Sequence, residues 1–317
     1  MTTVPIVFST DHNFIIPTCV AISSLLKSAE DKEKYDIFVF ADDDVTQEDK
    51  ELLMKEKDGI SHSKITFLFP AAQFKEAYEI REIKRATYFK LSIPWLLKEY
   101  DYVIYADSDI IFKKGLEEIY NANKTGDFYI AGVNLSKYTQ LHYLKDYIEK
   151  LGLDSKFYIN GGFIIFNCEK IRKDKNEKSL LTLCSNKYDF QDQDILNIVF
   201  KNGIKLLPAA YNKDVKYCDD LNLDDLYVLH YLGIKPWNAF THRWIDWWEC
   251  YKSSRNFNKE LLNKATRNIL MLQGESIKEV KNNQSDFVKL SRIFSKKIPL
   301  LNNVASFFFK TYGRIKR

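Results

Sequence analysis

Apolar, strand-like runs alternate with helix-like segments through the first hundred residues of this 317-residue chain. The pattern predicts strands at residues 5–9, 35–41, 64–69 and 103–106, and helices at residues 16–27, 46–57 and 85–98, the last interrupted by Pro94. Because the connections are short, this alternation favours an α/β fold with a mainly parallel sheet and helices on both faces. Ligands of such sheets bind at the carboxyl ends of the strands.

Two carboxylates, Asp107 and Asp109, follow the apolar run of the fourth expected strand. Unpaired charge resists burial, so a bound cation is the natural explanation for two acids where a strand leaves the core. A solvated turn after an edge strand gives the same short pattern. Phosphatases with an aspartate nucleophile also carry Asp-x-Asp, but there the strand usually opens the chain, whereas three expected strands precede it here. Metal binding is therefore the first hypothesis.

The loop after the first strand contains groups that suit a nucleotide base. No glycine-rich phosphate loop occurs in the first hundred residues, which disfavours a dinucleotide enzyme and a P-loop phosphotransferase. Asp11 and Asn13 offer hydrogen-bonding groups for a base edge, and Phe14 offers a stacking face. A polar loop with Phe14 packed into the core explains the same residues equally well.

Two later segments supply further polar candidates. Asn160 and two glycines precede an expected strand at residues 163–166, and glycines allow a ligand to approach the backbone closely. Residues 191–194, Gln-Asp-Gln-Asp, open an expected helix, where acids also serve simply to stabilise the first turn. Both segments therefore have a structural alternative.

The third late segment is a strand that ends near His230 and is followed by Gly233 and Lys235. An imidazole that joins two carboxylates suits Mn²⁺ or a related divalent ion. A glycine with a nearby lysine suits a diphosphate.

Taken in order along the chain, these motifs resemble glycosyltransferase family 8. This is a family of retaining enzymes of the GT-A fold that use UDP-sugars and include bacterial lipopolysaccharide galactosyl- and glucosyltransferases and glycogenin. The resemblance covers residues 4–240 and rests on Asp-x-Asn-Phe from Asp11, Arg-Ala-Thr-Tyr-Phe-Lys-Leu from Arg85, Tyr-Ala-Asp-Ser-Asp, Asn-Gly-Gly, Asp-Gln-Asp-Ile-Leu-Asn from Asp192, and His-Tyr-Leu-Gly-Ile-Lys-Pro-Trp from His230. It implies a Rossmann-like nucleotide-sugar-binding fold and transfer of glucose or galactose to a glycan.

The resemblance implies a role for each matching residue. Asp107, Asp109 and His230 would hold Mn²⁺, or Mg²⁺ in its place, against the donor diphosphate. The donor, UDP-glucose or UDP-galactose, would contact Thr10, Asp11, Asn13, Phe14, Arg85, Lys90, Asp107, Ser108, Gly233 and Lys235. The catalytic residues around the transferred sugar and the leaving group would be Asn160, Asp192, Gln193 and Lys235.

Retention of configuration limits the mechanism that the resemblance implies. A double displacement needs a carboxylate near the anomeric carbon, whereas the matching position carries Gln193, a poor nucleophile. We therefore expect same-face attack, in which a leaving phosphate oxygen accepts the proton of the acceptor hydroxyl. A covalent role for Asp192 or Asp194 is the alternative. Two departures from the family pattern are Lys90, where arginine is frequent, and a His-to-Lys spacing that is one residue shorter than in some members.

The charge of the chain is concentrated at its C-terminal end. Residues 287–317 contain eight Lys or Arg and no Asp or Glu, whereas residues 1–286 carry 39 basic and 43 acidic side chains. We expect a catalytic domain at 1–250 and a helical extension at 251–317 with a basic, aromatic tail. The apolar side chains of the tail suit either packing on the catalytic domain or binding to an anionic membrane surface, and lipid-linked acceptors favour the membrane.

Composition favours a cytoplasmic protein, and the basic tail at residues 287–317 suggests a peripheral position at the inner face of the plasma membrane. The sequence has no recognisable signal peptide or apolar membrane span, and its five cysteines show no paired spacing. We expect a lipid-linked or protein-linked glycan acceptor in cell-surface polysaccharide, lipopolysaccharide or glycoprotein synthesis. A catalytically silent sugar-nucleotide or glycan-binding protein is the rival interpretation, and nucleic-acid binding by the tail is disfavoured.

Overall fold

The computed structural model describes residues 2–29, 33–60, 63–80, 84–135, 142–220, 225–239 and 241–272. The chain divides into two compact units, Met1–Leu232 with Glu249–Asn256, and Gly233–Trp248 with Phe257–Arg317. The domain boundary expected at residue 250 stays a prediction. The tail at residues 287–317, to which the membrane hypothesis refers, lies outside the described residues.

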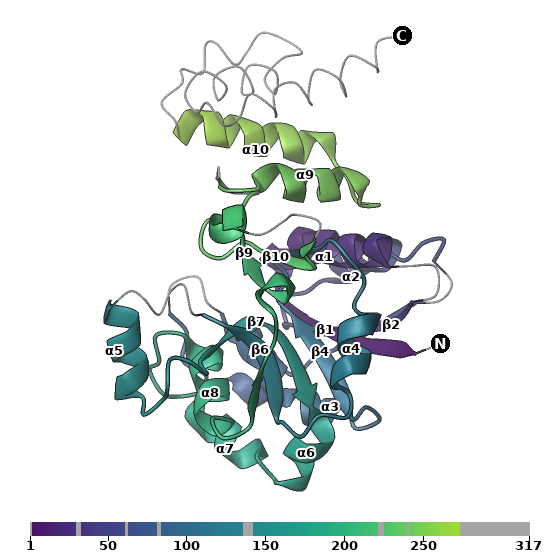
Figure 1. Cartoon of the computed structure of the whole chain (residues 1–317). Helices are drawn as coiled ribbons and strands as arrows, with labels where there is room; N and C mark the ends of the chain where they lie inside the picture. Colours follow the sequence, from purple (N-terminus) through teal and green to yellow (C-terminus); the bar gives the residue numbers. More distant parts are fainter. Residues whose placement is uncertain are drawn as a thin grey trace, which may run out of the picture. The chain divides into compact units, whose positions relative to one another are not determined.

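A seven-stranded sheet forms the centre of the first unit (Figure 1). Its order is β3 (Lys64–Leu68), β2 (Lys34–Ala41), β1 (Thr3–Thr10), β4 (Tyr102–Ala106), β7 (Ile159–Asn167), β6 (Ile130–Asn134) and β8 (Ile204–Leu206). Strand β7 is antiparallel to both of its neighbours, and the other pairs of this sheet are parallel. The predicted α/β class with a mainly parallel sheet is confirmed.

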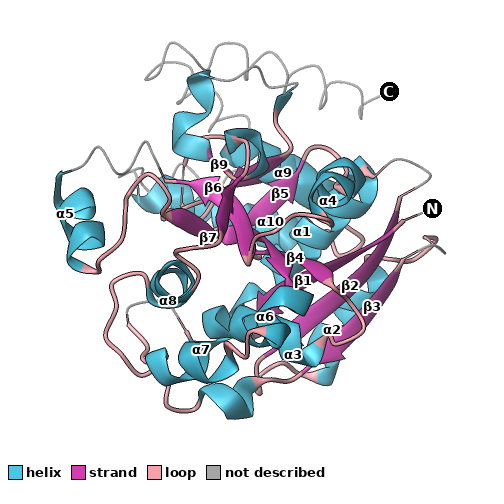
Figure 2. Ribbon diagram, turned by 60° about the horizontal axis from the view of Figure 1, so that its bottom comes forward, coloured by secondary structure: helices cyan, strands magenta, loops and turns pink. Residues whose placement is uncertain are grey.

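Helices cover both faces of this sheet (Figure 2). One face packs against α1 (Ile15–Ser28), α2 (Gln47–Lys55) and α4 (Glu117–Asn123), and the other against α3 (Ile93–Leu96), α6 (Cys168–Lys173), α7 (Glu177–Leu183) and α8 (Gln191–Val199). In β1, Ile6 and Phe8 join the first core while Val7 joins the second. Burial on both sides explains why the strands read as continuous apolar runs. The remaining helices are α5 (His142–Lys150), α9 (Trp244–Ser253) and α10 (Lys259–Leu272).

The helix expected at residues 85–98 is wrong in its form. Residues Arg85–Ser92 form a 3-10 helix, η3, and the short helix α3 follows with Pro94 in its first turn. Proline has no N–H, so it cannot extend the hydrogen-bond ladder of a preceding helix but is well tolerated at a helix start. The amide of Ile93 instead bonds the carbonyl of Lys90, three residues back.

The expectation that Asn160 and its two glycines precede a strand is also wrong. These residues lie inside β7, which begins at Ile159. A Cβ atom on Gly162 would lie 2.1 Å from Cε1 of His230, so the glycine is required by the close approach of this side chain to β7 and not by a turn before the strand.

A second, three-stranded sheet brings distant parts of the sequence together. Its order is β5 (Ile110–Phe112), β10 (Val228–His230) and β9 (Lys213–Asp214). Strand β10 runs antiparallel to β5 with His230 opposite Ile110, and parallel to β9 with His230 opposite Asp214. His230 is thereby fixed beside the segment that follows β4.

Within the second unit, tryptophan side chains pack together. The rings of Trp237 and Trp247 have centroids 5.0 Å apart, and those of Trp247 and Trp248 are 4.9 Å apart and nearly perpendicular. The indole N–H of Trp248 donates to the carbonyl of Pro236 at 3.0 Å. Trp247 and Trp248 are buried, as core side chains are.

Two further expectations concern cysteines and membrane spans. All five cysteines lie in the described part of the chain, and none is joined in a disulfide. Among the described residues, no helix has both the length and the apolar character needed to cross a bilayer.

Thr46 caps α2, and this cap gives a test of the fold. Its hydroxyl accepts from the amide of Asp49 at 3.2 Å, and the Asp49 carboxylate accepts from the amide of Thr46 at 2.8 Å. Thr46→Ala should lower the free energy of unfolding in urea by about 0.5–2 kcal/mol. Thr182→Ala is the control, because it removes an exposed hydroxyl that donates to the carbonyl of Lys178 in the same helix. It should lower the free energy of unfolding by less than Thr46→Ala does. Equal losses of unfolding free energy in the two variants would contradict the cap.

Candidate active site

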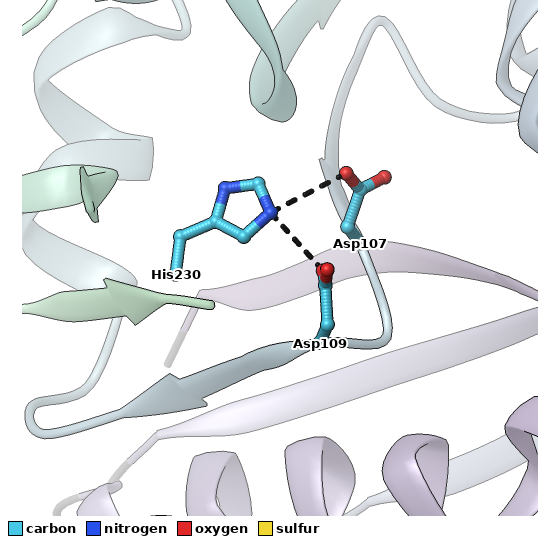
Figure 3. Close-up of side chains that lie close together, drawn as sticks. All are labelled: Asp107, Asp109 and His230. Atoms are coloured by element: carbon cyan, nitrogen blue, oxygen red, sulfur yellow. Dashed lines mark ion pairs between the residues drawn. The ribbon is translucent and has the colours of Figure 1, made fainter. Parts of the chain in front are cut away.

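Asp107, Asp109 and His230 converge at the carboxyl end of β4 (Figure 3). One ligand atom from each lies within 4.8 Å of the others. Nε2 of His230 is 3.1 Å from Oδ1 of Asp109 and 3.7 Å from Oδ2 of Asp107. His230 and Asp109 are buried, whereas the side chain of Asp107 is 30% exposed. The predicted metal ligands therefore lie together.

Backbone pairing on two sides positions these three residues. The amide of Asp107 donates to the carbonyl of Gly162 in β7 at 2.9 Å, and the amide of Tyr231 donates to the carbonyl of Asp109 at 3.0 Å. The first bond fixes the start of the loop, and the second fixes its end against β10. The side chains are thus placed by two sheets and not by a mobile turn.

The donor set fits a divalent cation. Two carboxylates and one imidazole are suitable ligands for Mn²⁺, and also for other divalent ions. Placing two carboxylates against a buried imidazole with no cation would leave negative charge that resists burial. The ring also presents Nε2 to both acids in Figure 3, as a ligand should.

Lys90 links this group to Asp192, which opens α8. Its ammonium lies 3.2 Å from Oδ1 of Asp107 and 2.7 Å from Oδ2 of Asp192, and it donates to the carbonyl of Gly161 at 3.0 Å. Burial acts to lower the pKa of Lys90, but the two carboxylates outweigh burial and hold that pKa well above its usual value. Lys90 is therefore a buried ammonium ion between two sets of residues. On one side is the metal group, which is Asp107, Asp109 and His230. On the other is the predicted sugar site, which is Asn160, Asp192 and Gln193.

The amides of Asn160 and Gln193 lie side by side beyond Lys90. Nδ2 of Asn160 donates to Oε1 of Gln193 at 3.1 Å, and the same oxygen accepts from the amide of Gly161 at 2.9 Å. Both side chains are buried. The structure thus brings together Asn160, Asp192 and Gln193, which the family resemblance assigned to the transferred sugar.

Asp192 and Asp194 of α8 are both more than helix-stabilising acids, because both are buried and bonded to specific partners. Asp194 accepts from the hydroxyl of Tyr147 at 2.6 Å, from the amide of Phe190 at 2.9 Å, and from the hydroxyl of Tyr158. Burial raises the pKa of Asp194, while the two tyrosine hydroxyls act to lower it. Both oxygens of this carboxylate are therefore occupied within the fold.

The residue before Asp192 carries backbone strain. Gln191 is fully buried and has φ = +44°, a backbone conformation that residues other than glycine seldom adopt. Its amide group donates to the carbonyl of Tyr78 at 2.8 Å. Strained residues of this kind often occur at functional sites, and this one sets the direction in which α8 begins.

The loops that follow β1, β2 and β4 meet at the carboxyl ends of these strands, where ligands of such sheets are expected to bind. The amide of Asp42 donates to the carbonyl of Thr10 at 3.0 Å, and the hydroxyl of Ser108 donates to the carbonyl of Ser9 at 2.8 Å. The Thr18 hydroxyl lies within hydrogen-bond distance of the hydroxyls of Thr10 and Ser108. These contacts hold the loop after β1, which contains Asp11, Asn13 and Phe14 and is called the base loop below, next to the metal group.

The base loop itself has mixed exposure. Asp11 is buried and accepts from the amide of Phe14 at 3.1 Å, and burial raises its pKa. Asn13 is exposed and Phe14 is partly buried. The contacts of these residues with uridine stay predictions.

Arg85 has partners that the sequence did not suggest. Its Nε donates to the two oxygens of Asp42 at 2.8 and 3.0 Å, and its Nη2 bonds Asp43 at 3.0 Å. Arg85 is therefore tied to the carboxyl end of β2, whereas Lys90 provides the cation beside Asp107.

Gly233 and Lys235 belong to the second unit and are described within it. Gly233 has φ = +75°, which suits glycine, and the carbonyl of Lys235 accepts from the amides of Asn238 and Ala239 at 3.0 Å each. Their expected contacts with phosphate stay predictions.

Sequence reasoning missed two residues that contact the metal group. The hydroxyl of buried Tyr105 donates to Oδ1 of Asp107 at 2.7 Å, and Oδ1 of Asn212 lies 2.8 Å from Nδ1 of His230. Tyr105 stands within the strand of the Asp-Ser-Asp motif, where two-residue alternation could have placed it. Asn212 stands in no motif. It comes near His230 through the pairing of β9 with β10, which the local sequence does not reveal.

Comparison with known proteins gives the class of this site. The model of the family described as Glycosyl transferase family 8 matches residues 5–241, which is most of the chain. The protein belongs to glycosyltransferase family 8. This membership confirms the resemblance inferred from the motifs.

Two relatives and one solved structure show how similar this chain is to individual proteins. A putative glycosyltransferase of Haemophilus influenzae is 28% identical over 66% of this chain and 63% of its own length. The lipopolysaccharide 1,2-glucosyltransferase of Escherichia coli is 23% identical over 75% of this chain and 73% of its own length. The crystal structure of the galactosyltransferase LgtC, solved with donor and acceptor sugar analogs, superimposes with a TM-score of 0.66 at 22% identity, covering 82% of this chain and 99% of that one.

Gly162→Ala tests the geometry of the metal group. The added Cβ would lie 2.1 Å from Cε1 of His230 and 2.9 Å from Oδ2 of Asp107, so His230 must move. We expect Mn²⁺ affinity, measured by calorimetric titration, to fall at least about tenfold, the smaller loss typical of disturbed ligand orientation.

Gly152→Ala is a control that adds the same methyl group at a position away from the three predicted metal ligands. Gly152 has φ = +72° and no atom within 4 Å of an added Cβ, so this variant should lose about 1–2 kcal/mol of stability and keep its Mn²⁺ affinity. Equal Mn²⁺ affinity in both folded variants would contradict the proposed geometry.

Proposed function

We propose that this protein is a retaining, Mn²⁺-dependent hexosyltransferase that moves glucose or galactose from UDP to a glycan acceptor. The observation that carries the proposal is the convergence of Asp107, Asp109 and His230, with Lys90 joining them to Asp192. A divalent cation held by the first three residues would bind the negatively charged diphosphate of a nucleotide-sugar. The buried carboxylate of Asp192 would then lie near the sugar. Mg²⁺ in place of Mn²⁺ is compatible with the same ligands.

The cation, held by Asp107, Asp109 and His230, would neutralise negative charge on the departing diphosphate. Tyr105 and Lys90 orient Asp107 through Oδ1, which leaves Oδ2 directed toward His230. Lys90 also holds Asp192 at a fixed position, from which its carboxylate would accept hydrogen bonds from sugar hydroxyls.

Same-face attack is the mechanism that the residues around Asp192 support best. Gln193 is an amide, and Asp194 is held by two tyrosine hydroxyls and a backbone amide. Asp192 is ion-paired with Lys90, which stabilises it as a carboxylate but lowers its reactivity as a nucleophile. We therefore propose that a phosphate oxygen of the leaving UDP takes the proton of the acceptor hydroxyl.

For the acceptor we propose a glycan of a cell-surface polysaccharide, a lipopolysaccharide or a glycoprotein, whether lipid-linked or protein-linked. The similarity to the lipopolysaccharide 1,2-glucosyltransferase of Escherichia coli and the motifs shared with this family support this class of acceptor. The motifs shared with the family also support a UDP-sugar as the donor.

For the location we propose the cytoplasm, with the protein peripheral at the inner face of the plasma membrane through residues 287–317. The support is the composition of this segment, which has eight basic and no acidic residues together with several phenylalanines. Nucleic acid is not among the proposed partners.

Asp109→Asn tests the proposed reaction. The amide keeps the size of the side chain but removes a ligand charge, so hydrolysis and transfer from UDP-glucose or UDP-galactose should fall by more than about 100-fold. Chelation of Mn²⁺ in the unmodified protein should have the same effect. Products are measured by mass spectrometry with each donor and with membrane glycolipid extracts as acceptors.

Asp127→Asn is the matched control, because Asp127 has a highly exposed side chain and the same charge change. Turnover that persists in excess chelator would contradict the metal hypothesis. Mn²⁺-dependent UDP binding without turnover of either donor would instead support the rival interpretation, a silent sugar-nucleotide-binding protein.

The proposed membrane contact has its own test. Lys296→Gln with Lys297→Gln should weaken co-sedimentation with phosphatidylserine vesicles by about 2 kcal/mol, roughly 30-fold, since each basic residue near such a surface contributes about 1 kcal/mol. Lys64→Gln with Lys145→Gln, two exposed lysines of the first unit, is the control. Equal losses for both pairs would contradict a specific role of the tail.

A further inference from the structure

We propose that Asn212 is a positioning residue that fixes the proton of His230 on Nδ1 and couples the metal group to the amides of the sugar site. This inference rests on the proposed function, because it assigns a role within the same site. Asn212 itself follows the short helix η4 (Ala209–Tyr211) and precedes β9, and its side chain is buried.

A continuous chain of hydrogen bonds connects Asn212 with both parts of the site. Its Oδ1 lies 2.8 Å from Nδ1 of His230, and its Nδ2 lies 2.7 Å from Oδ1 of Asn160. Asn160 in turn bonds Gln193 at 3.1 Å. Each member of the chain is buried, so each polar atom must find its partner within the protein.

Two backbone amides determine which way the side-chain amides of this chain point. The amide of Gly162 donates to Asn160 at 2.9 Å, and the amide of Gly161 donates to Gln193 at 2.9 Å. A backbone N–H can only donate, so the atoms that it meets are the carbonyl oxygens Oδ1 of Asn160 and Oε1 of Gln193. Neither side chain can be flipped without placing two donors together.

The same reasoning then passes to Asn212 and His230. Because Oδ1 of Asn160 is an acceptor, the atom of Asn212 that faces it must be the donor Nδ2. The remaining atom, Oδ1 of Asn212, faces the imidazole and accepts a proton, so Nδ1 of His230 carries that proton. Nε2 is left with its lone pair directed toward Asp107 and Asp109, as a metal ligand requires (Figure 3).

The far end of the chain is anchored by a carboxylate. Nε2 of Gln193 donates to the hydroxyl of Tyr158 at 3.1 Å, and that hydroxyl donates to Asp194. The hydrogen-bond directions therefore agree from Asp194 to His230. A displacement of Gln193 or Asn160 at the sugar site would pass through Asn212 to the imidazole, and this continuity is the proposed coupling.

Two substitutions of Asn212 separate its contacts. Asn212→Ala removes both, so the imidazole loses the group that holds its tautomer and orientation. Mn²⁺ affinity is measured in the full-length protein by electron paramagnetic resonance of unbound Mn²⁺. It should fall about 10- to 100-fold, which is the usual loss when a metal-ligating histidine loses its hydrogen-bond partner. Asn212→Asp keeps an acceptor for Nδ1 but places a second acceptor against Oδ1 of Asn160.

The aspartate variant should therefore bind Mn²⁺ as tightly as the unmodified protein. Its kcat with UDP-sugar should nevertheless fall, because Asn160 and Gln193 are displaced while the metal group is intact. Asn123→Ala is the control: Asn123 is a buried asparagine whose Nδ2 bonds the carbonyl of Ile119 at 2.7 Å, so its loss should lower stability and leave Mn²⁺ affinity unchanged. Unchanged Mn²⁺ affinity in folded Asn212→Ala would overturn the proposal.

Nitrogen-15 spectra of histidine-labelled, metal-free protein provide a readout that does not depend on metal binding. At a pH where the ring is neutral, His230 should have its proton on Nδ1, and Asn212→Ala should show a mixture of the two tautomers. A proton on Nε2 in the unmodified protein would overturn the inference. If the protein binds no Mn²⁺ but shows the Nδ1 tautomer, the proposed function fails while the role of Asn212 in holding the ring is supported.

Discussion

The carboxylates gathered at the carboxyl end of β4 are the constraint on which the site depends. The buried ammonium of Lys90 pairs with Asp107 and Asp192. The imidazole of His230 lies beside Asp107 and Asp109. Burying like charges together is unfavourable unless cations or donors compensate them. Lys90 compensates part of this charge, and the proposed divalent cation would compensate more. The close backbone packing at Gly162 and the strained residue Gln191 are understandable as the means of assembling this arrangement.

Local sequence patterns predicted much of the fold because the main determinants are local. Unbroken apolar runs indicated strands buried on both faces, and Asp107 and Asp109 stood out because charges interrupt such a run. The form of the helix near Pro94 was mispredicted, since helical periodicity does not distinguish a 3-10 helix from an α-helix over two turns. The place of Asn160 within β7 was also missed, because glycines that suit a turn equally suit close packing between strands.

The long-range part of the site could not be derived from local patterns. The residue type of His230 and the family resemblance made it a candidate metal ligand, whereas its placement beside Asp107 and Asp109 follows from the antiparallel pairing of β10 with β5. Asn212 carried no motif, and its importance depends on hydrogen bonds to residues of two other strands, Asn160 in β7 and His230 in β10. The contrast between Asp192 and Asp194 likewise needed the structure: one faces Lys90 and the other is held by tyrosines. Single polar residues acquire such roles only when the fold supplies their partners.

Pulsed electron paramagnetic resonance of Mn²⁺ with UDP tests the central claim most directly, because it reports the atoms bound around the ion. Our account predicts a nitrogen-14 coupling from Nε2 of His230 and a phosphorus-31 coupling from UDP at the same Mn²⁺ ion, with the nitrogen coupling lost in His230→Ala. Mn²⁺ that binds the protein and UDP with no nitrogen coupling, or with a coupling that His230→Ala leaves unchanged, would contradict the assignment of Asp107, Asp109 and His230 as the metal site.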